Sequence, residues 1–273
     1  NLRLEAEWKP DSLTTIIVQP NINYNYETSG SYRDYIYLQD ADTTSYGNAR
    51  NSGQNNSLSA GLRLIVSRKF PSKPGRTLTA NVRSGFSQSE NMRYNFSNKM
   101  SDTTTVINQF TRNTSDRFSV DARVSFVEPL WNNKNMLEAV LAFSSTTQNS
   151  IKDQYASLDN LAFYNKNPED YTIYVDEYSN TFRNRFLQET LELNYRFTEK
   201  DYNLTLGMKA EPSQTLSQTY YKNGNVRDVE NNVINFAPNG RFQYNFRKKE
   251  FLRVDYRGYT RQSSINQMQP VKN

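Results

Sequence analysis

The 273-residue chain contains neither cysteine nor histidine. Without cysteine, a disulfide framework and thiolate-based zinc sites are excluded. Without histidine, the chain lacks the usual general base and the commonest metal ligand, so Ser-His-Asp and histidine–zinc chemistry are excluded as well. We therefore expect no enzymatic activity, no cofactor and no bound metal ion.

Apolar residues are also scarce. They make up 36% of the chain, and the mean hydropathy is −0.86, whereas a soluble α/β enzyme of this length needs more apolar residues to fill its core. No run of about 18 apolar residues occurs, so a transmembrane helix is not expected. No signal peptide is visible, because residues 1–5 already alternate as a strand does. We expect the chain to be an internal or processed piece of a longer protein.

Aromatic residues, in contrast, are abundant: 19 Tyr, 15 Phe and 2 Trp, far more than a disordered chain carries. The net charge of +5, from 33 basic and 28 acidic residues, is small and dispersed along the chain. No basic cluster of the kind that binds nucleic acid stands out, so nucleic-acid binding is not expected.

Apolar and polar residues alternate with a period of two along much of the chain, as in strands with one apolar face. In residues 118–126 (FSVDARVSF), the apolar residues at even positions alternate with Ser, Asp and Arg at odd positions. Most such segments meet or exceed the 9–11 residues, roughly, that a tilted strand needs to cross a bilayer. The pattern predicts ten strands, at residues 1–8, 13–26, 55–69, 77–91, 115–128, 135–149, 183–197, 202–217, 236–246 and 251–261.

The connections between these strands alternate between short and long. An outer-membrane barrel has short periplasmic turns and long external loops, and consecutive connections must lie on opposite sides of the membrane. A β-sandwich has no reason to follow this rule. The expected short connections are 9–12, 70–76, 129–134, 198–201 and 247–250, and the long ones are 27–54, 92–114, 150–182 and 218–235, with residues 262–273 beginning another external loop.

Alternation alone fits both a soluble sandwich and a membrane barrel, but strand length, loop alternation and the aromatics near strand ends favour the barrel. We therefore predict an all-β fold, an antiparallel transmembrane β-barrel of which about ten strands are present. Because the chain starts within the pattern and ends on a loop, the strands are expected to be part of a larger barrel. A soluble β protein, with the aromatics in its core, is the remaining alternative.

Two parts of the sequence resemble a known family. Residues 252–258 (LRVDYRG) and 260–271 (TRQSSINQMQPV) are similar to a strand-and-loop motif of the Bacteroidetes outer-membrane β-barrel proteins related to TonB-dependent receptors. The opening residues 1–12, with Ile22 and Tyr24 beyond them, resemble the same family's barrel segment.

This resemblance implies a barrel of roughly 22 strands. It also implies a plug, a small periplasmic domain and uptake energised by a TonB-type partner. Residues 1–273 are expected to form the barrel segment alone, without plug or periplasmic domain. Some relatives resemble assembly or scaffold components instead of pumps.

The charged residues on the polar faces of the predicted strands should line the barrel interior. They form a selective pore wall, a surface that grips a plug, or a hydrated, salt-bridged lumen that only fills space. The expected lumen-lining residues are Arg63, Arg83, Asp121, Arg123, Glu192, Arg196, Arg253, Asp255 and Arg257, and the same alternation places Arg3, Glu5 and Glu138 on this face.

The long connections are rich in Tyr, Asn, Asp and Ser. Tyrosine beside amides suits the recognition of sugars or peptides, although a self-packed loop would have the same composition. Asn223–Gly224 predicts a type I′ turn in the fourth long connection. The candidate ligand-binding residues of the surface loops are Tyr32, Tyr35, Tyr37, Tyr164, Tyr171 and Tyr174.

Two sets of acidic residues have compositions that other kinds of site use. Asp34, Asp40 and Asp42 could supply oxygen ligands to calcium, but their spacing matches no known calcium loop. The carboxylate pairs 169–170 and 176–177 are compatible with glycosidase chemistry, which nothing else in the sequence supports.

Two functions remain for a barrel in the Gram-negative outer membrane with its loops outside the cell. The first is a TonB-dependent type of receptor that binds or takes up a siderophore, glycan or peptide. The second is a structural or assembly barrel that transports nothing and binds other outer-membrane proteins. Besides outer-membrane lipid, the expected partners are a TonB-type energising protein, a surface lipoprotein or other outer-membrane proteins.

Overall fold

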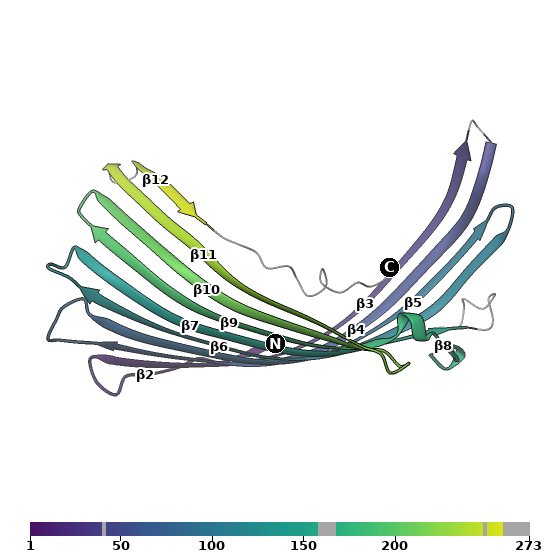
Figure 1. The fold of residues 1–273 in the computed structure, drawn as a ribbon, viewed down its shortest axis with the longest axis horizontal. Coiled ribbons are helices and arrows are strands. Elements are labelled where there is room, and N and C mark those ends of the chain that lie inside the picture. The colour runs from purple at the N-terminus through teal and green to yellow at the C-terminus, as the bar shows by residue number, and fades with distance from the viewer. Residues whose placement is uncertain (40–41, 158–167, 248–249, 259–273) are drawn as a thin grey trace.

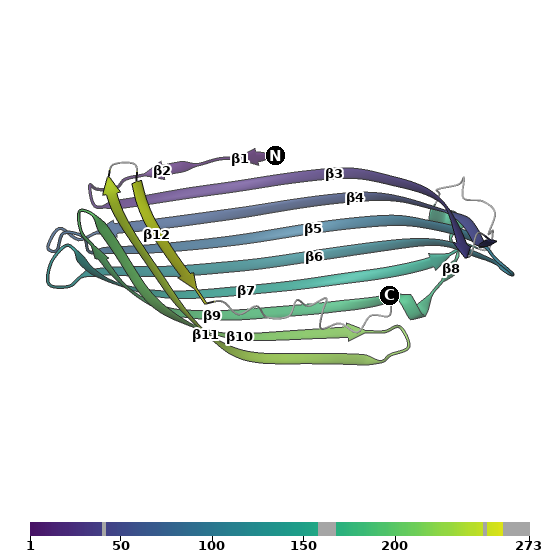
Figure 2. The same ribbon diagram turned by 90° about the horizontal axis from the view of Figure 1, so that it is seen from above.

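The computed structural model describes residues 1–39, 42–157, 168–247 and 250–258. In these ranges the chain forms one 12-stranded sheet in which all pairings are antiparallel. Figure 1 shows that the sheet curves into an open trough, and the sheet order places β1, β2 and the outer part of β3 along one edge and β12 along the other. Seen from above, the long strands run side by side in sequence order (Figure 2).

The strands are β1 (Leu2–Arg3), β2 (Ala6–Trp8), β3 (Thr14–Gln39), β4 (Asp42–Lys69), β5 (Thr77–Met100), β6 (Thr104–Pro129), β7 (Asn135–Ala156), β8 (Ile173–Tyr174), β9 (Asn180–Thr198), β10 (Tyr202–Tyr220), β11 (Val226–Arg247) and β12 (Glu250–Arg257). Two short 3-10 helices, η1 (Pro168–Asp170) and η2 (Asp176–Tyr178), lie between β7 and β9. No helix in the described ranges has the length and apolarity needed to cross a membrane.

The predicted strand order is confirmed. Neighbours in the sheet are neighbours in sequence, along β1-β3-β4-β5-β6-β7-β9-β10-β11-β12. The expected first strand, 1–8, is broken into β1 and β2, which pair with successive parts of β3. The fold class is confirmed as well, as an all-β, antiparallel partial barrel. In the described ranges β12 does not pair with β1, β2 or β3, so the trough is open.

The short connections lie where the sequence predicts them, at one end of the sheet. Residues 70–76 connect β4 to β5, and residues 130–134 connect β6 to β7. Gly75 has a φ of +94°, a conformation that a residue with a Cβ rarely adopts. Residues 248–249, in the last predicted turn, are outside the described ranges. This edge of the sheet, formed by residues 9–13, 70–76, 130–134 and 199–201, is called the turn end.

Three of the four predicted long connections are wrong. Residues 27–54 are the paired ends of β3 and β4, apart from residues 40–41, which are outside the described ranges. Residues 92–114 are β5 and β6 with a turn at 101–103, and residues 218–235 are β10 and β11 with a turn at 221–225. These segments are polar on both faces and so lose the alternation that marks a half-buried strand. Their backbone hydrogen bonds continue regardless, because Tyr and Thr favour strands and both faces tolerate polar groups.

The connection predicted at 150–182 is shorter than expected but remains a long excursion. β7 continues to Ala156 and β9 begins at Asn180, and between them the described residues 168–179 form η1, β8 and η2. β8 pairs with the last two residues of β7, so this segment is attached to the sheet.

The turn around Gly224 also differs from the prediction. The backbone N–H of Tyr221 donates to the carbonyl of Asn225 over 2.9 Å, which leaves three residues in the loop instead of two. Gly224 has a φ of +84°, and its N–H donates to the carbonyl of Tyr221. A three-residue loop with a left-handed glycine at its last position is the next commonest hairpin after the two-residue type I′ turn.

The two faces of the trough differ sharply in chemistry. The convex face of each strand carries an apolar stretch close to the turn end, about 7–9 residues long, as in residues 58–66, 78–86, 118–126 and 191–197. These side chains are exposed: Leu193 to 52%, Met208 to 59% and Phe236 to 66%. Together they form an apolar band of about the height that a tilted strand needs to cross a bilayer.

The concave face is polar, and its curvature crowds the side chains together. Only five apolar residues are buried in the described part of the chain, against thirteen polar ones. Glu138 and Asn194, which face the interior, are 7% and 5% exposed. A soluble sandwich would bury the apolar face and expose the polar one, so this inversion fits a barrel with lipid outside.

An arginine on the convex face should therefore be far more costly than one on the concave face. We expect Leu193→Arg to lower the free energy of unfolding in lipid vesicles by about 2–4 kcal/mol, the cost of a lipid-facing charge near the midplane. Thr190→Arg, on the concave face of the same strand, should cost less than about 1 kcal/mol. Denaturant titration in vesicles measures both, and equal costs would contradict the assignment of the faces.

An ion cluster stabilises the turn end, outside the apolar band. Glu128 accepts hydrogen bonds from Arg76 Nε and Lys73 Nζ, both over 2.6 Å. The hydrogen bonds from Arg76, and then those from Lys73, lower the pKa of Glu128 from 4.5 to about 2. The folded state thus keeps this carboxylate ionised at pH values where the unfolded chain protonates it.

The contribution of Glu128 to stability is complete above its unfolded pKa and is lost as the pH falls toward its folded pKa. We expect the unfolding temperature of the wild type in detergent to fall between about pH 5 and pH 2 more steeply than that of Glu128→Gln. Parallel profiles for the two proteins would show that the cluster has no effect on stability.

Candidate functional site

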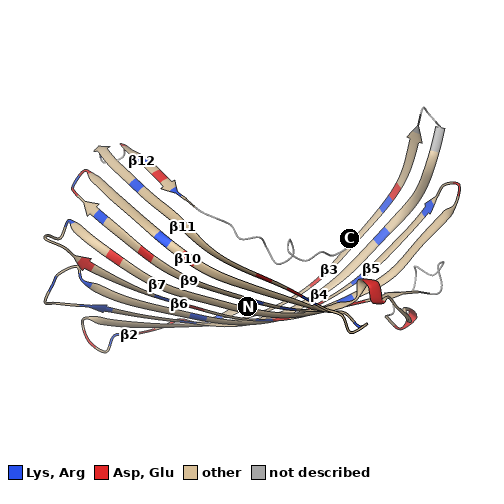
Figure 3. Ribbon diagram, viewed as in Figure 1, with Lys and Arg blue, Asp and Glu red and all other residues tan. Residues whose placement is uncertain are grey.

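The predicted lumen-lining residues all lie on the concave face. Arg63 is opposite Arg83, which is opposite Asp121 on the next strand. The remaining six, Arg123, Glu192, Arg196, Arg253, Asp255 and Arg257, have the same orientation on β6, β9 and β12. Their role as the lining of a closed lumen stays a prediction. Figure 3 shows charges of both signs spread over several strands.

The best-connected part of this face surrounds Glu138 on β7. Glu138 accepts hydrogen bonds from Ser125 Oγ over 2.7 Å and from Asn194 Nδ2 over 3.2 Å, and it forms an ion pair with Arg196. Asn194 Nδ2 also approaches Glu192 to within 2.9 Å, and Glu192 lies 3.5 Å from Arg123. These contacts link β6, β7 and β9. Buried charges are stable when they are paired and hydrogen-bonded in this way.

A second set of ion pairs lies on β10, β11 and β12. Asp255 accepts hydrogen bonds from Arg241 and Arg253, each over 2.6 Å, and Lys209 pairs with Glu211 at 2.9 Å. With Glu192, Asn194, Arg196, Asn239 and Arg257, several of these residues line an open hollow of about 810 Å³. Both signs of charge are present there, and Arg196, Lys209 and Arg241 are each paired with a carboxylate. This part of the wall fits the interpretation of a salt-bridged lumen.

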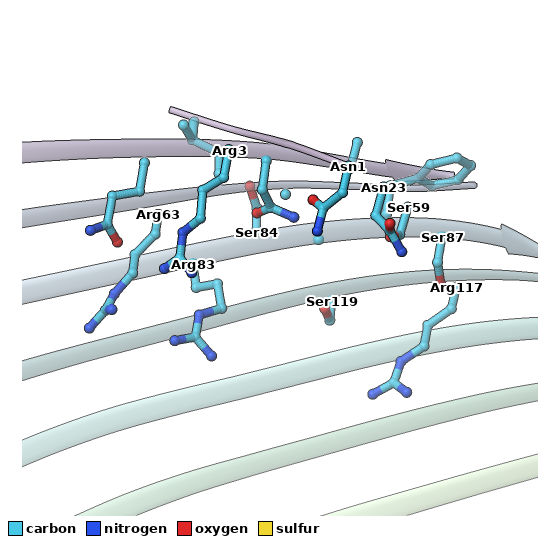
Figure 4. Close-up of a pocket in the computed structure, with 17 residues that line it drawn as sticks. Asn1, Arg3, Asn23, Ser59, Arg63, Arg83, Ser84, Ser87, Arg117 and Ser119 are labelled. Atoms are coloured by element: carbon cyan, nitrogen blue, oxygen red, sulfur yellow. The ribbon is translucent and has the colours of Figure 1, made fainter. Parts of the chain in front are cut away.

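A hollow of different character, of about 650 Å³, lies near β1. It is lined by Arg3, Arg63, Arg83 and Arg117 together with small and amide side chains, and none of the described residues that line it is acidic. Figure 4 shows the four guanidinium groups, each from a different strand, with Ser87 and Ser119 near them. We call these four residues the arginine group. Sequence alternation placed Arg3 on this face, but Arg117 was not among the expected lumen residues.

Two of the candidate tyrosines belong to an aromatic cluster at the end opposite the turns. Tyr171 is buried against Tyr94 and Phe110, with ring centroids 5.7 Å apart in both pairs. Its hydroxyl donates to Asn108 Oδ1 over 2.9 Å. Burial raises the pKa of Tyr94 and Tyr171 above the usual value. Tyr171 therefore packs the 168–179 segment onto the sheet.

Tyr174, in β8, is the more accessible of the two. Its ring lies 5.3 Å from that of Tyr155, its hydroxyl donates to Asp153 over 3.1 Å, and Lys222 Nζ sits 3.6 Å above its ring. Burial is the largest cause of its raised pKa. These residues line an open hollow of about 530 Å³ that includes Tyr220 and Tyr221.

Three more candidates lie on β3 and not in a loop. Tyr32 donates to Asp34, and the guanidinium of Arg50 lies 4.7 Å from the centre of its ring. Tyr35 and Tyr37 have ring centroids 5.5 Å apart and occupy the opposite face of the strand from Tyr32. Tyr164, the last of the six, is outside the described ranges. The structure thus does not gather these tyrosines into one site, and their binding role stays a prediction.

The acidic residues of the possible calcium and glycosidase sites do not come together either. Asp34 is bonded to Tyr32, and Asp40 and the side chain of Asp42 are outside the described residues. Residues 169–170 lie in η1 and residues 176–177 in η2. In the part of the chain that the structure describes, no group of three or more acidic side chains is placed to hold a metal ion.

Comparison with known proteins finds similarity to solved structures alone. No family model matches the chain, and no curated protein does. Among solved structures, the chain is similar to the ferric yersiniabactin uptake receptor FyuA from Yersinia pestis, with 10% identity and a TM-score of 0.36. The match covers 90% of this chain and 42% of that receptor chain, so this chain spans less than half of the receptor's length. The relationship to Bacteroidetes proteins stays a prediction.

Loss of Arg196, the cation paired with Glu138, should destabilise the protein. We expect Arg196→Gln to lower the free energy of unfolding by about 1.5–3 kcal/mol, because a charge-assisted hydrogen bond to a nearly buried carboxylate is lost. Arg257→Gln is the matched control, since Arg257 forms no ion pair in the described ranges, and it should change stability by less than about 0.5 kcal/mol. Both free energies are measured by denaturant titration in vesicles, and equal stability of the two variants would contradict the role of Arg196.

Proposed function

We propose that the chain is part of the wall of an outer-membrane β-barrel that takes up a solute from outside the cell. The observation that supports this most is the inversion of the sheet, with an exposed apolar band on the convex face and a crowded polar concave face. Spanning strands require a closed barrel with lipid outside and polar groups inside, and this chain supplies such a wall.

The openness of the sheet supports a wide lumen. Ten successive strands along the main path leave the two rims far apart (Figure 1), so closure needs further strands. Barrels of about 16–22 strands enclose an aqueous channel or a plugged lumen, whereas about eight strands are filled by their own side chains. The open polar hollows on the concave face, of about 650 and 810 Å³, fit a wall that faces water or a solute.

The proposed orientation places the turn end in the periplasm. Short turns are typical of the periplasmic side, and extended hairpins of the external side. β3 to β6 continue well beyond the apolar band, so their ends would project from the cell surface. We propose uptake of the TonB-dependent type, for a siderophore, a glycan or a peptide, through a barrel related to the Bacteroidetes family that the sequence resembles.

A second function is a scaffold that transports nothing and binds other outer-membrane proteins. The aromatic cluster supports it, because Tyr94, Phe110 and Tyr155 lie on the continuation of the convex face beyond the apolar band. The segment 168–179 covers part of this cluster. Because Tyr94, Phe110 and Tyr171 are buried in this packing, the surface offered to a neighbouring protein is the outer side of the segment 168–179.

Uptake by cells separates the two functions. We expect a strain that lacks the whole gene to lose accumulation of at least one nutrient solute, and the full-length gene to restore it. Because transport of this type needs energy from the inner membrane, an uncoupler should abolish the restored accumulation. Candidate solutes are compared by uptake of radiolabelled siderophore, glycan and peptide mixtures.

Two other outcomes would overturn the proposal of uptake. Unchanged accumulation of every solute, together with loss of other proteins from the outer membrane in the deletion strain, would overturn uptake and favour the scaffold. Recovery of the full-length protein in the soluble fraction, folded without detergent, would exclude both.

A further inference from the structure

We infer that the arginine group is a binding site for a small soluble solute bearing several carboxylate or phosphate groups. The site would recognise this solute on the concave face, between β1 and β6. The inference rests on the proposed function, because a solute reaches this face only through the lumen of a barrel. It adds the chemical class of the solute.

The four guanidinium groups lack the partners that other arginines of this face have. Arg196, Arg241 and Arg253 are each paired with a carboxylate. None of the arginine group forms an ion pair in the described ranges, and Arg63 has only a neutral contact, donating to Asn81 Oδ1 over 3.2 Å. Four unneutralised cations on a sheet with many carboxylates indicate a place for an anion from outside the sheet.

The nearest carboxylates on this face have other partners. Glu5 accepts a hydrogen bond from Gln19 Nε2 over 2.6 Å, and Asp121 accepts one from Ser144 Oγ over 2.7 Å. Neither lines the hollow of the arginine group, although Asp121 is opposite Arg83 in register. Neither carboxylate forms an ion pair with an arginine of the group in the described ranges, so no direct ion pair from the sheet neutralises these guanidinium groups.

Two glycines at the bottom of the hollow carry no side chains. Gly61 and Gly85 are directly opposite each other, and Gly85 is opposite Ser119. A Cβ at Gly61 would lie 2.7 Å from Asn21 Oδ1, and a Cβ at Gly85 would lie 3.2 Å from Ser119 Oγ. The glycines thus leave space between the arginines, and nearby amides and hydroxyls (Asn21, Asn23, Ser59, Ser87 and Ser119) can donate to an oxyanion.

The spacing of the arginines indicates several anionic groups. Arg63 and Arg83 face each other across one strand pair, and like charges in that position destabilise a sheet until a counter-charge binds. From Arg3 on β1 to Arg117 on β6 there are four strand steps, roughly 19 Å at about 4.8 Å each. One phosphate or carboxylate can contact one arginine pair bidentately but cannot span this distance.

The location favours a soluble solute over a lipid headgroup, because the exposed apolar side chains that would contact acyl chains are on the opposite, convex face. Both sources offer the same phosphate chemistry, so the experiment includes one probe of each kind. The probes are citrate, tripolyphosphate and dihexanoyl phosphatidic acid, with glucose as the neutral comparison. Calorimetric titration of the full-length protein in detergent at low salt measures the binding of each.

Two variants test separately whether binding depends on the charge of the arginines and on the open space between them. Arg63→Gln with Arg83→Gln should weaken citrate and tripolyphosphate binding at least about tenfold, since two charge-assisted contacts are lost. Gly85→Leu keeps every charge but fills the floor, and should weaken binding by a similar factor. Lys209→Gln is the control, because Lys209 is paired with Glu211 at 2.9 Å on a distant strand, and binding should stay within about twofold. The heat-shifted migration of folded barrels on gels confirms that each variant is folded.

Binding of both soluble probes that falls with rising salt and is lost in the two site variants supports the site. Equal binding by wild type and the arginine variant, or binding of phosphatidic acid alone, overturns it. Uptake of a solute by cells together with no binding of any probe overturns the site but leaves the proposed function intact. Probe binding in a protein that transports nothing supports the site and overturns the uptake function.

Discussion

Main-chain hydrogen bonding between long neighbouring strands is the constraint on which the rest of this structure depends. The chain has too few apolar residues for a soluble core, and five apolar side chains are buried in its described part. The sheet is held by its ladders, such as the continuous pairing of β4 with β5 from Lys69–Thr77 to Tyr46–Met100. In a membrane this pairing is obligatory, because lipid offers no partner to a free backbone group.

Curvature then assigns a role to each face. The concave side chains are brought together, so residues such as Glu138 and Asn194 are buried by their polar neighbours and not by a core. The convex side chains spread apart and expose an apolar band. On the concave face, most charges neutralise one another across strands, and this makes the unpaired arginine group near β1 distinctive.

The strand order, the turn end and the orientation of the nine lumen-lining candidates were predictable from the sequence, because alternation with period two fixes which side chains share a face. The ends of β3 to β6 far from the turn end were not predictable, because Ser, Asn and Thr occur on both of their faces and leave no alternation to detect. The pairing of Glu138 with Arg196 was not predictable either, because it depends on cross-strand register. The burial of Tyr171 by Tyr94 and Phe110 was also not predictable from the sequence. The low floor at Gly61 and Gly85 also depends on register, which the sequence alone does not give.

The central claim is that the convex face contacts acyl chains while the concave face contacts water. Since the chain has no cysteine, a single spin label can be attached at Leu206→Cys on the convex face or at its neighbour Thr205→Cys on the concave face. In vesicles, electron paramagnetic resonance should find that the label at 206 collides with oxygen and is shielded from a water-soluble nickel complex, while the label at 205 shows the reverse. If both labels preferred the nickel complex, or if 206 were shielded from both reagents inside a soluble protein, the account would be contradicted.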